Sequence, residues 1–302
     1  MAAYDFDIGV IGGGAAGLTV ASGSAQLGAK TVLVEQEELL GGDCLHFGCV
    51  PSKTLIKSAS VYHQLGRQEM YGLPPVAPEP VDFKAVRGRV QQVVSTIQHH
   101  DSVERFSGLG VAVKFGAASF RDNHLVDTGT EKISARKWVV ATGSSPAALA
   151  LPGLADIATL TNREIFHLDY LPESLIIIGA GPIGIEMAQA FSRLGSKVTV
   201  LQRSPQILSS EDADFADDLK KILENEGIDF HLGCTMLSAA EEGAQKTVAI
   251  RNADDQELKI CGSDILVAAG RRVNVEGLAL ENGGIDFDRK GIAVDRRLRT
   301  ST

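Results

Sequence analysis

Residues 8–35 read IGVIGGGAAGLTVASGSAQLGAKTVLVE, and the same pattern returns at residues 175–202 as LIIIGAGPIGIEMAQAFSRLGSKVTVLQ. The glycines recur at one offset (179 − 12 = 181 − 14 = 184 − 17 = 167), pairing Gly12, Gly14 and Gly17 with Gly179, Gly181 and Gly184. The match continues through Leu27, Gly28 and Lys30 to Leu194, Gly195 and Lys197. One G-x-G-x-x-G is a weak signal, whereas two copies in the same context indicate an internal duplication.

Each copy predicts a strand, a glycine turn, a helix and a second strand. The expected strands are 8–11, 31–35, 175–178 and 198–202, and the expected helices are 15–29 and 183–195. In such a unit the first glycine permits a tight turn, the second lets the backbone approach a pyrophosphate, and the third lets the helix close onto the strand. The free N–H groups at the helix start then face the phosphates. The sequence therefore predicts an α/β protein with two Rossmann-like, doubly wound dinucleotide-binding domains.

The residue that ends each second strand helps to select the nucleotide. Glu35 lies 18 residues after Gly17, about where an acid accepts hydrogen bonds from an adenosine ribose, which suits FAD or NAD. The second copy has Gln202 at this place, followed by Arg203. The carboxylate that would repel a 2′-phosphate is replaced and a cation is added, so this copy favours NADP over NAD.

Length and charge narrow the function classes. The chain has 302 residues with 29 basic and 38 acidic side chains, a formal charge of −9, and 44% hydrophobic residues. Two folded domains are expected, and the acidic balance argues against nucleic acid as a partner. No signal peptide is expected at the N-terminus, and the apolar run 175–185 is too short for a membrane span. With four cysteines and no disulfide framework, a cytoplasmic location is expected.

Between the copies, residues 41–53 read GGDCLHFGCVPSK. Cys44 and Cys49 can close a small ring where the backbone is irregular, and Gly48 and Pro51 allow a distorted helix start there. A cysteine at a helix N-terminus with Lys53 nearby is expected to have a depressed pKa and to react as thiolate. The alternatives are a metal site or two buried thiols. The C-x4-C spacing is not that of zinc sites, so no metal is expected.

This segment, with a dinucleotide fold on either side, resembles the class I pyridine nucleotide-disulfide oxidoreductases, the family of glutathione reductase, dihydrolipoamide dehydrogenase and mercuric reductase. Residues 139–144, VVATGS, resemble the strand that crosses under the flavin, and residues 268–271, AAGR, resemble the end of the pyridine-nucleotide domain. The resemblance implies an FAD-binding domain at residues 1–149, an inserted NAD(P)-binding domain at 150–272, and a segment at 273–302 that returns to the first domain.

The same resemblance implies a relay in which NAD(P)H gives hydride to FAD and the reduced flavin opens a Cys44–Cys49 disulfide. Cys49 would form the charge-transfer contact with the flavin, and Cys44 would attack the substrate. Lys53 would lie near the flavin in a buried ion pair with Glu186. Two alternatives stay open: a flavin reductase or NADH oxidase without a disulfide relay, and a redox-responsive binding protein.

The candidate cofactor residues share a place in the glycine turns, the cysteine segment or the strand ends. They are Gly12, Gly14, Ala15, Ala16, Gly17, Glu35, Gly42, Asp43, Ala141, Thr142, Gly143, Gly179, Gly181, Ile183, Gly184, Gln202, Arg203 and Gly270. The sequence departs from the family at Asp43, where threonine is usual, at His46-Phe47, at Pro182 and at Ser209.

Family members are longer, so we expect a fragment that ends before a C-terminal dimerisation domain, from a homodimeric parent. The implied substrate is a small disulfide, a dihydrolipoamide-type compound or Hg(II). Other candidates were assigned structural roles: His99 and His100 as a solvated helix end, Cys234 and Cys261 as packing residues. We also expect a loop at 73–80 and a helix that the acidic stretch 211–218 opens and that continues to 224.

Overall fold

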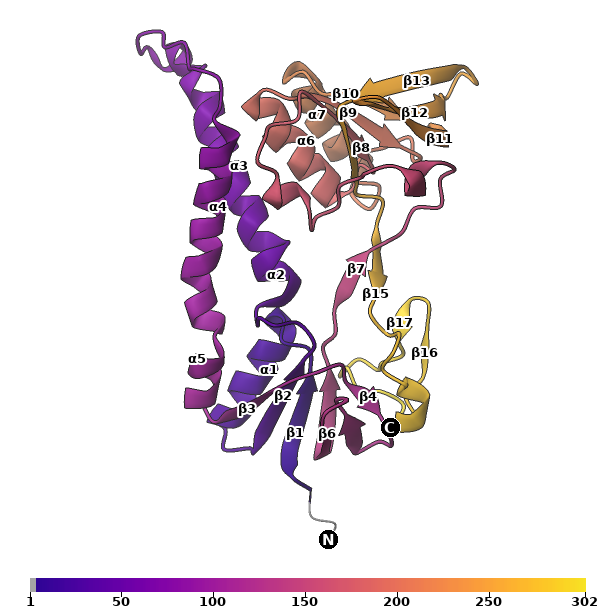
Figure 1. Cartoon of the computed structure of the whole chain (residues 1–302). Helices are drawn as coiled ribbons and strands as arrows, with labels where there is room; N and C mark the ends of the chain where they lie inside the picture. Colours follow the sequence, from indigo (N-terminus) through magenta and orange to yellow (C-terminus); the bar gives the residue numbers. More distant parts are fainter. Residues whose placement is uncertain (1–3) are drawn as a thin grey trace. The chain divides into compact units, whose positions relative to one another are not determined.

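The protein is described from a computed structural model that places residues 4–302 (Figure 1). Its contacts divide the chain into two compact units. Unit 1 comprises Met1–Val50, Val93–Ser145 and Arg271–Thr302, and unit 2 comprises Pro51–Gln92 and Pro146–Gly270. The division from the sequence used residues 149 and 272 as boundaries; the contacts change unit at 145/146 and 270/271 and also group residues 51–92 with unit 2.

Unit 1 is built on a six-stranded sheet of order β3-β2-β1-β6-β5-β4. The strands are β1 (Phe6–Ile11), β2 (Thr31–Glu35), β3 (Val111–Phe115), β4 (Ser119–Phe120), β5 (Leu125–Asp127) and β6 (Lys132–Val140). Strands β3, β2, β1 and β6 pair in parallel, while β4 and β5 add antiparallel pairs beside β6. Strand β2 is buried at every residue, as expected for a strand inside a parallel sheet covered on both faces.

Helix α1 (Ala15–Gln26) follows β1 and packs on the sheet. The sequence predicted this helix to residue 29, and that end is wrong by three residues. The backbone turns at Leu27, and Gly28 takes a left-handed conformation with φ 87°, which ends the helix. The strand predicted at 31–35 is confirmed as β2.

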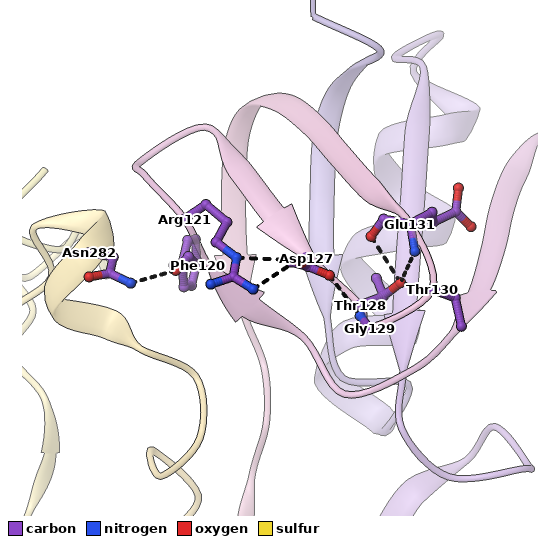
Figure 2. Close-up of polar contacts among 8 residues, drawn as sticks. All are labelled: Phe120, Arg121, Asp127, Thr128, Gly129, Thr130, Glu131 and Asn282. Atoms are coloured by element: carbon purple, nitrogen blue, oxygen red, sulfur yellow. Dashed lines mark hydrogen bonds and ion pairs between the residues drawn. The ribbon is translucent and has the colours of Figure 1, made fainter.

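The C-terminal segment completes the core of unit 1. Leu278, Leu280 and Ile285 are buried in one apolar cluster with Phe120 and Val126. The side chain of Asn282 donates to the carbonyl of Phe120 at 2.9 Å, as Figure 2 shows. In the same view Arg121 donates twice to the Asp127 carboxylate, at 2.9 and 3.2 Å, and Thr128 holds the turn to Glu131. Residues far apart in sequence thus share this β4–β5 corner.

Unit 2 contains a four-stranded parallel sheet of order β10-β9-β8-β14. Its strands are β8 (Ser174–Ile178), β9 (Lys197–Gln202), β10 (Asp229–Leu232) and β14 (Asp264–Val267), and its helices are α6 (Pro182–Leu194) and α7 (Ala213–Asn225). A second, antiparallel sheet holds β11 (Thr235–Glu242), β12 (Gln245–Arg251) and β13 (Glu257–Gly262). Helix α6 starts at Pro182 and ends at Leu194, one residue earlier at each end than predicted, because proline suits the first helical position and Gly195 turns left-handed at φ 117°.

The remaining helices are α2 (Gly42–His46), α3 (Cys49–Leu65), α4 (Phe83–Gln98) and α5 (Val103–Gly108), with short 3-10 turns η1 (Gln68–Tyr71), η2 (His99–Asp101), η3 (Leu154–Asp156), η4 (Ile165–His167) and η5 (Leu280–Gly283). Leu55, Ala59, Phe83 and Val90 of α3 and α4 are buried in the same cluster as Phe191 of α6, which is why residues 51–92 belong to unit 2. Residues 73–80 form a loop, as predicted. Helix α7 begins within the acidic stretch 211–218, as predicted, and ends at Asn225, one residue beyond the predicted end.

Short strand pairs complete the structure: β7 (Ser144–Pro146) with β15 (Arg271–Val273), and β16 (Phe287–Asp288) with β17 (Gly291–Ile292). Within residues 4–302, no helix combines the length and the apolar character needed to cross a membrane.

Candidate active site

The two glycine turns have the same geometry. Gly12 and Gly179 open the turns with φ 107° and 110°, in the left-handed region that favours glycine. A Cβ at Gly12 would collide with the carbonyl of Ala141, and one at Gly179 with the carbonyl of Ala268. Each first glycine therefore makes a tight turn directly against the end of a neighbouring strand, β6 in unit 1 and β14 in unit 2.

The third glycine of each turn has no room for a side chain either. A Cβ at Gly17 would collide with the carbonyl of Gly12, and one at Gly184 with the carbonyl of Gly179. The start of each helix is thus pressed onto the turn that precedes it. This close approach is the role that the sequence analysis gave to the third glycine.

The middle glycines are less crowded than the first and third. The nearest atom to a Cβ at Gly14 is the Cα of Gly42, 3.8 Å away, and among the described residues a Cβ at Gly181 would meet no atom within 4 Å. Both are N-cap residues with extended backbones, at the start of α1 and of α6. Neither helix has an acidic residue in its first turn. Each turn is therefore a cradle in which helical N–H groups face outward, suited to a phosphate.

The residues that end the second strands make the same contact in both copies. Oε2 of Glu35 accepts a hydrogen bond from Gly13 N at 2.5 Å, and Oε1 of Gln202 accepts one from Ala180 N at 3.3 Å. Glu35 is 7% exposed, and its other oxygen accepts bonds from the next two backbone amides. Arg203, beside Gln202, is exposed. Backbone amides thus hold the Glu35 carboxylate against the first cradle, and the Gln202 side-chain amide takes the same place at the second cradle.

The duplication extends beyond the predicted stretch. Gly13 O accepts from Gly41 N and Ala180 O accepts from Leu208 N, both at 2.8 Å, and 208 − 41 is again 167. Both residues have left-handed backbones, with φ 112° at Gly41 and 45° at Leu208. A leucine in this conformation hides the match from a search based on glycines.

The two candidate redox cysteines are adjacent in unit 1. Cys44 lies half-buried in α2, and Cys49 is the exposed first residue of α3; both are free thiols. Burial, followed by a hydrogen bond with Cys49, raises the pKa of Cys44 to about 11. The sequence predicted a lowered pKa for a helix-start cysteine in this segment; for Cys44 the direction is the opposite, because desolvation penalises its thiolate.

Lys53 and Glu186 form an ion pair within unit 2, with Nζ at 2.6 and 2.7 Å from the two carboxylate oxygens. The side chains of Lys53 and Glu186 are 61% and 36% exposed, so the prediction that this ion pair is buried is wrong. Helix α3 presents the lysine and α6 presents the glutamate.

The strand-end residues 141–143 are tied to residues that sequence reasoning missed. Thr142 Oγ1 donates to Asn274 O at 2.7 Å, and Asn274 Nδ2 donates to Thr142 O at 2.8 Å. Gly143 O accepts from Asn274 N at 3.0 Å. Asn274 follows its partners by more than 130 residues, and no spacing pattern in the sequence connects them.

Asp43, a candidate cofactor residue, forms an ion pair with an arginine that lies 228 residues later in the sequence. Arg271 Nη2 lies 2.9 Å from Asp43 Oδ2, and the same guanidinium donates to Ser144. From the sequence, Arg271 was expected only as part of a domain end, with no role in the site. Gly270, just before it, has φ 137° and lies exposed.

The groups set aside as structural stay outside the site. His99 and His100 are exposed in η2. Cys234 is buried, as its predicted packing role requires, and burial raises its pKa. Cys261 is exposed, so the packing role predicted for it is wrong. Across residues 4–302, no three His, Cys, Asp or Glu side chains are arranged to hold a metal ion.

Comparison with known proteins matches residues 6–302 to the pyridine nucleotide-disulphide oxidoreductase family. The chain belongs to this family. A dihydrolipoyl dehydrogenase of Bacillus subtilis is 33% identical over 297 residues, which cover 97% of this chain and 64% of the relative. A mercuric reductase of Streptomyces lividans is 33% identical over 303 residues, covering 98% and 63%. The chain thus spans less than two thirds of the length of these relatives.

A solved relative has the same fold. The flavoprotein disulfide reductase RclA from Escherichia coli, as its Cu(II) complex, superposes with a TM-score of 0.84 at 28% identity, covering all of this chain and 64% of RclA. The α/β fold class and the family resemblance expected from the sequence are both confirmed.

Members of the pyridine nucleotide-disulphide oxidoreductase family use FAD with NAD(P)H as electron donor. This chain fits two dinucleotides, because it contains two open cradles at helix starts, each with a glycine that leaves the approach to the backbone free.

Proposed function

We propose that this chain is the cofactor-binding and dithiol-bearing part of an FAD-dependent NAD(P)H:disulfide oxidoreductase. The observation that carries the proposal is the hydrogen-bonded pair Cys44 and Cys49, which lies in the same unit as the first cradle. Family membership supports it, since the relatives include dihydrolipoyl dehydrogenases and mercuric reductases. The substrate class is therefore a small disulfide, a dihydrolipoamide-type compound or Hg(II).

We assign FAD to the cradle at Gly12, Gly14 and Gly17 and NADP to the cradle at Gly179, Gly181 and Gly184. Glu35 supports the first assignment, because its carboxylate is fixed beside the cradle with capacity for further hydrogen bonds. For the second, a neutral amide takes the place of the acid at Gln202 and the adjacent Arg203 is exposed to a 2′-phosphate. The other candidate cofactor residues keep the roles that their positions beside these turns give them.

FAD, when bound, supplies the transfer of an electron pair from NAD(P)H to the Cys44–Cys49 disulfide. The chain supplies the sulfurs: breaking their bond takes two electrons, and with two protons it yields the two thiols. Cys44, with its raised pKa, holds its proton at neutral pH. A proton acceptor must therefore assist Cys44 before it attacks a substrate. In this proposal Lys53, held by Glu186, provides positive charge for the reduced cofactor.

The proposal extends to the longer protein of which this chain would be a part. Because the relatives are longer than this chain, we propose that a homodimeric parent completes the substrate site, and that the 302-residue chain alone turns over disulfide substrates poorly. The low cysteine content fits a cytoplasmic location.

Counting thiols tests the proposal. The air-oxidised chain is loaded with FAD, treated with NADPH without oxygen, denatured and titrated with a thiol reagent. We expect two free thiols before NADPH and four after it. Cys44→Ser and Cys49→Ser should abolish the gain, whereas Cys261→Ser, an exposed cysteine outside the pair, should preserve a gain of two.

The two alternative functions predict different results in this experiment. No gain in the wild type, with the flavin still reduced, would reject the dithiol relay in favour of a flavin-only reductase. A partner that binds only the oxidised chain, with no turnover by the parent, would favour a redox-responsive binding protein.

A further inference from the structure

An acidic residue follows the loop that packs against the first phosphate cradle. Gly14, the N-cap of α1, is bridged to Gly41, and a Cβ at Gly42 would lie only 2.6 Å from the Cα of Gly14. Asp43 is the next residue along α2. Asp43 is thus one residue away from the contact with the N-cap of α1, and an unneutralised carboxylate in this loop opposes the binding of an anionic phosphate, because like charges repel.

Arg271 supplies the opposite charge. Its Nη2 donates to Asp43 Oδ2 at 2.9 Å and to the carbonyl of Ser144 at 2.5 Å, and its Nε donates to Ser144 Oγ at 2.8 Å. The arginine side chain is 28% exposed and the aspartate 36%. Three contacts therefore orient the guanidinium, with all three residues in unit 1. An oriented, partly buried pair neutralises its carboxylate better than a mobile surface pair.

The second copy has no acidic residue at the position that corresponds to Asp43. At the offset of 167, the position of Asp43 corresponds to Ser210, which is uncharged and exposed. The acid thus belongs to the first copy alone, at a position where the family resemblance expects threonine.

We propose that Arg271 is the counter-ion of Asp43 and a positioning residue for dinucleotide binding: by neutralising this carboxylate it allows the pyrophosphate of FAD to bind at the Gly14 cradle. The proposal rests on the assignment of FAD to this cradle. The aspartate, once neutralised, becomes an anchor that ties the turn of Cys44 to the β7–β15 pair.

Titration of the FAD-free chain with FAD, followed by flavin fluorescence, tests the proposal without NADPH or substrate. We expect Arg271→Gln to raise the dissociation constant about tenfold, an effect that shrinks at high salt. Asp43→Asn in the Arg271→Gln background should restore affinity to within about threefold of the wild type. Arg272→Gln is the matched control, since the neighbouring arginine contacts Glu276 at the surface and should leave affinity unchanged.

Two results would overturn the proposal. Wild-type affinity in Arg271→Gln would show that Asp43 needs no counter-ion. A double variant as weak as Arg271→Gln would show that the arginine acts by another route. Thermal unfolding of each FAD-free variant shows whether the variant is folded. If Arg271→Gln does not fold, the charge-retaining Arg271→Lys takes its place, and we expect it to retain part of the affinity for FAD. Failure of the dithiol relay in the thiol count would leave these binding results standing.

Discussion

Gly17 and Gly23 show how differently two glycines of one helix are used. Both lie in α1, but a Cβ at Gly17 would strike the carbonyl of Gly12, whereas one at Gly23 would meet no described atom within 4 Å. The first glycine lets α1 close onto β1. The second only adds backbone freedom to the unfolded chain.

We therefore expect Gly17→Ala to lower the free energy of unfolding by about 2–4 kcal/mol, because α1 must move away from its turn. Gly23→Ala should raise it by about 0.5–1 kcal/mol. Urea unfolding at neutral pH measures both. Equal effects of the two substitutions would contradict the close packing of α1 on the Gly12 turn.

Single residues were predictable from the sequence where the constraint is local. The glycines of each turn follow from spacing alone, and so does the exchange of Glu35 for Gln202. The pairing of Asp43 with Arg271 was not predictable, because 228 residues separate them and only the folded sheet brings them together. The contact of Lys53 with Glu186 was expected only through the family resemblance.

At the scale of elements, α6 and α7 are joined by a partly buried ion pair. Arg193 of α6 donates from Nε and Nη2 to both oxygens of Glu226, the residue that caps α7, at 2.8 and 2.7 Å. The side chains are 19% and 9% exposed. Burial alone would raise the pKa of Glu226, but the hydrogen bonds from Arg193 and Gln189, together with the charge of Arg193, outweigh it and lower the pKa.

Arg193→Met should destabilise the protein by about 3 kcal/mol at neutral pH, since it leaves the Glu226 carboxylate without its counter-ion and with only the hydrogen bond from Gln189. The lowered pKa of Glu226 means that its contribution is present above about pH 4.5 and is lost as the pH falls through its folded-state value. The difference between wild type and Glu226→Gln should therefore shrink from pH 7 to pH 3 in urea unfolding.

An exposed pair on α7 provides the control. Lys221 and Asp218 lie 3.0 Å apart with most of their surfaces in solvent, so Lys221→Met should leave the unfolding free energy nearly unchanged. A pH-independent loss in Glu226→Gln would show that packing, not charge, accounts for the effect.

Elements were predicted well in type and less well at their ends. The β8-α6-β9 unit was expected from its glycines, and its helix differs by one residue at each end because Pro182 and Gly195 set its limits. The three-residue error at α1 has the same origin, since periodicity continues past Gln26 while the backbone turns at Leu27 and Gly28.

On the scale of the whole molecule, each unit has its own apolar clusters. Leu280 is fully buried in unit 1 although it lies near the end of the chain, and Leu298, in the same C-terminal segment, is 80% exposed. The clusters of unit 2 are made of other residues.

Leu280→Ala should cost about 2–5 kcal/mol and act on one unit only. In hydrogen exchange followed by mass spectrometry, we expect β4 and β5 to lose protection while β11–β13 keep theirs. Leu298→Ala should change neither. Loss of protection in both units would show that they unfold as a single cooperative body.

The sequence predicted two nucleotide-binding folds but not the unit to which residues 51–92 belong. Helix α3 begins with Cys49, so the cysteine motif draws attention to unit 1, while Leu55 and Ala59 pack in unit 2. Motifs mark chemistry, whereas unit membership depends on which apolar surfaces meet.

The paired cradles have a consequence for fidelity. Two turns with matching backbones share one polypeptide, so neither can reject the other's dinucleotide by the shape of its main chain. Discrimination between the two dinucleotides must come from side chains at the rims of the cradles. In a newly made chain, either dinucleotide could otherwise bind at the wrong cradle. Selection against the wrong dinucleotide would then act on a few side chains at the rims rather than on the glycine turns.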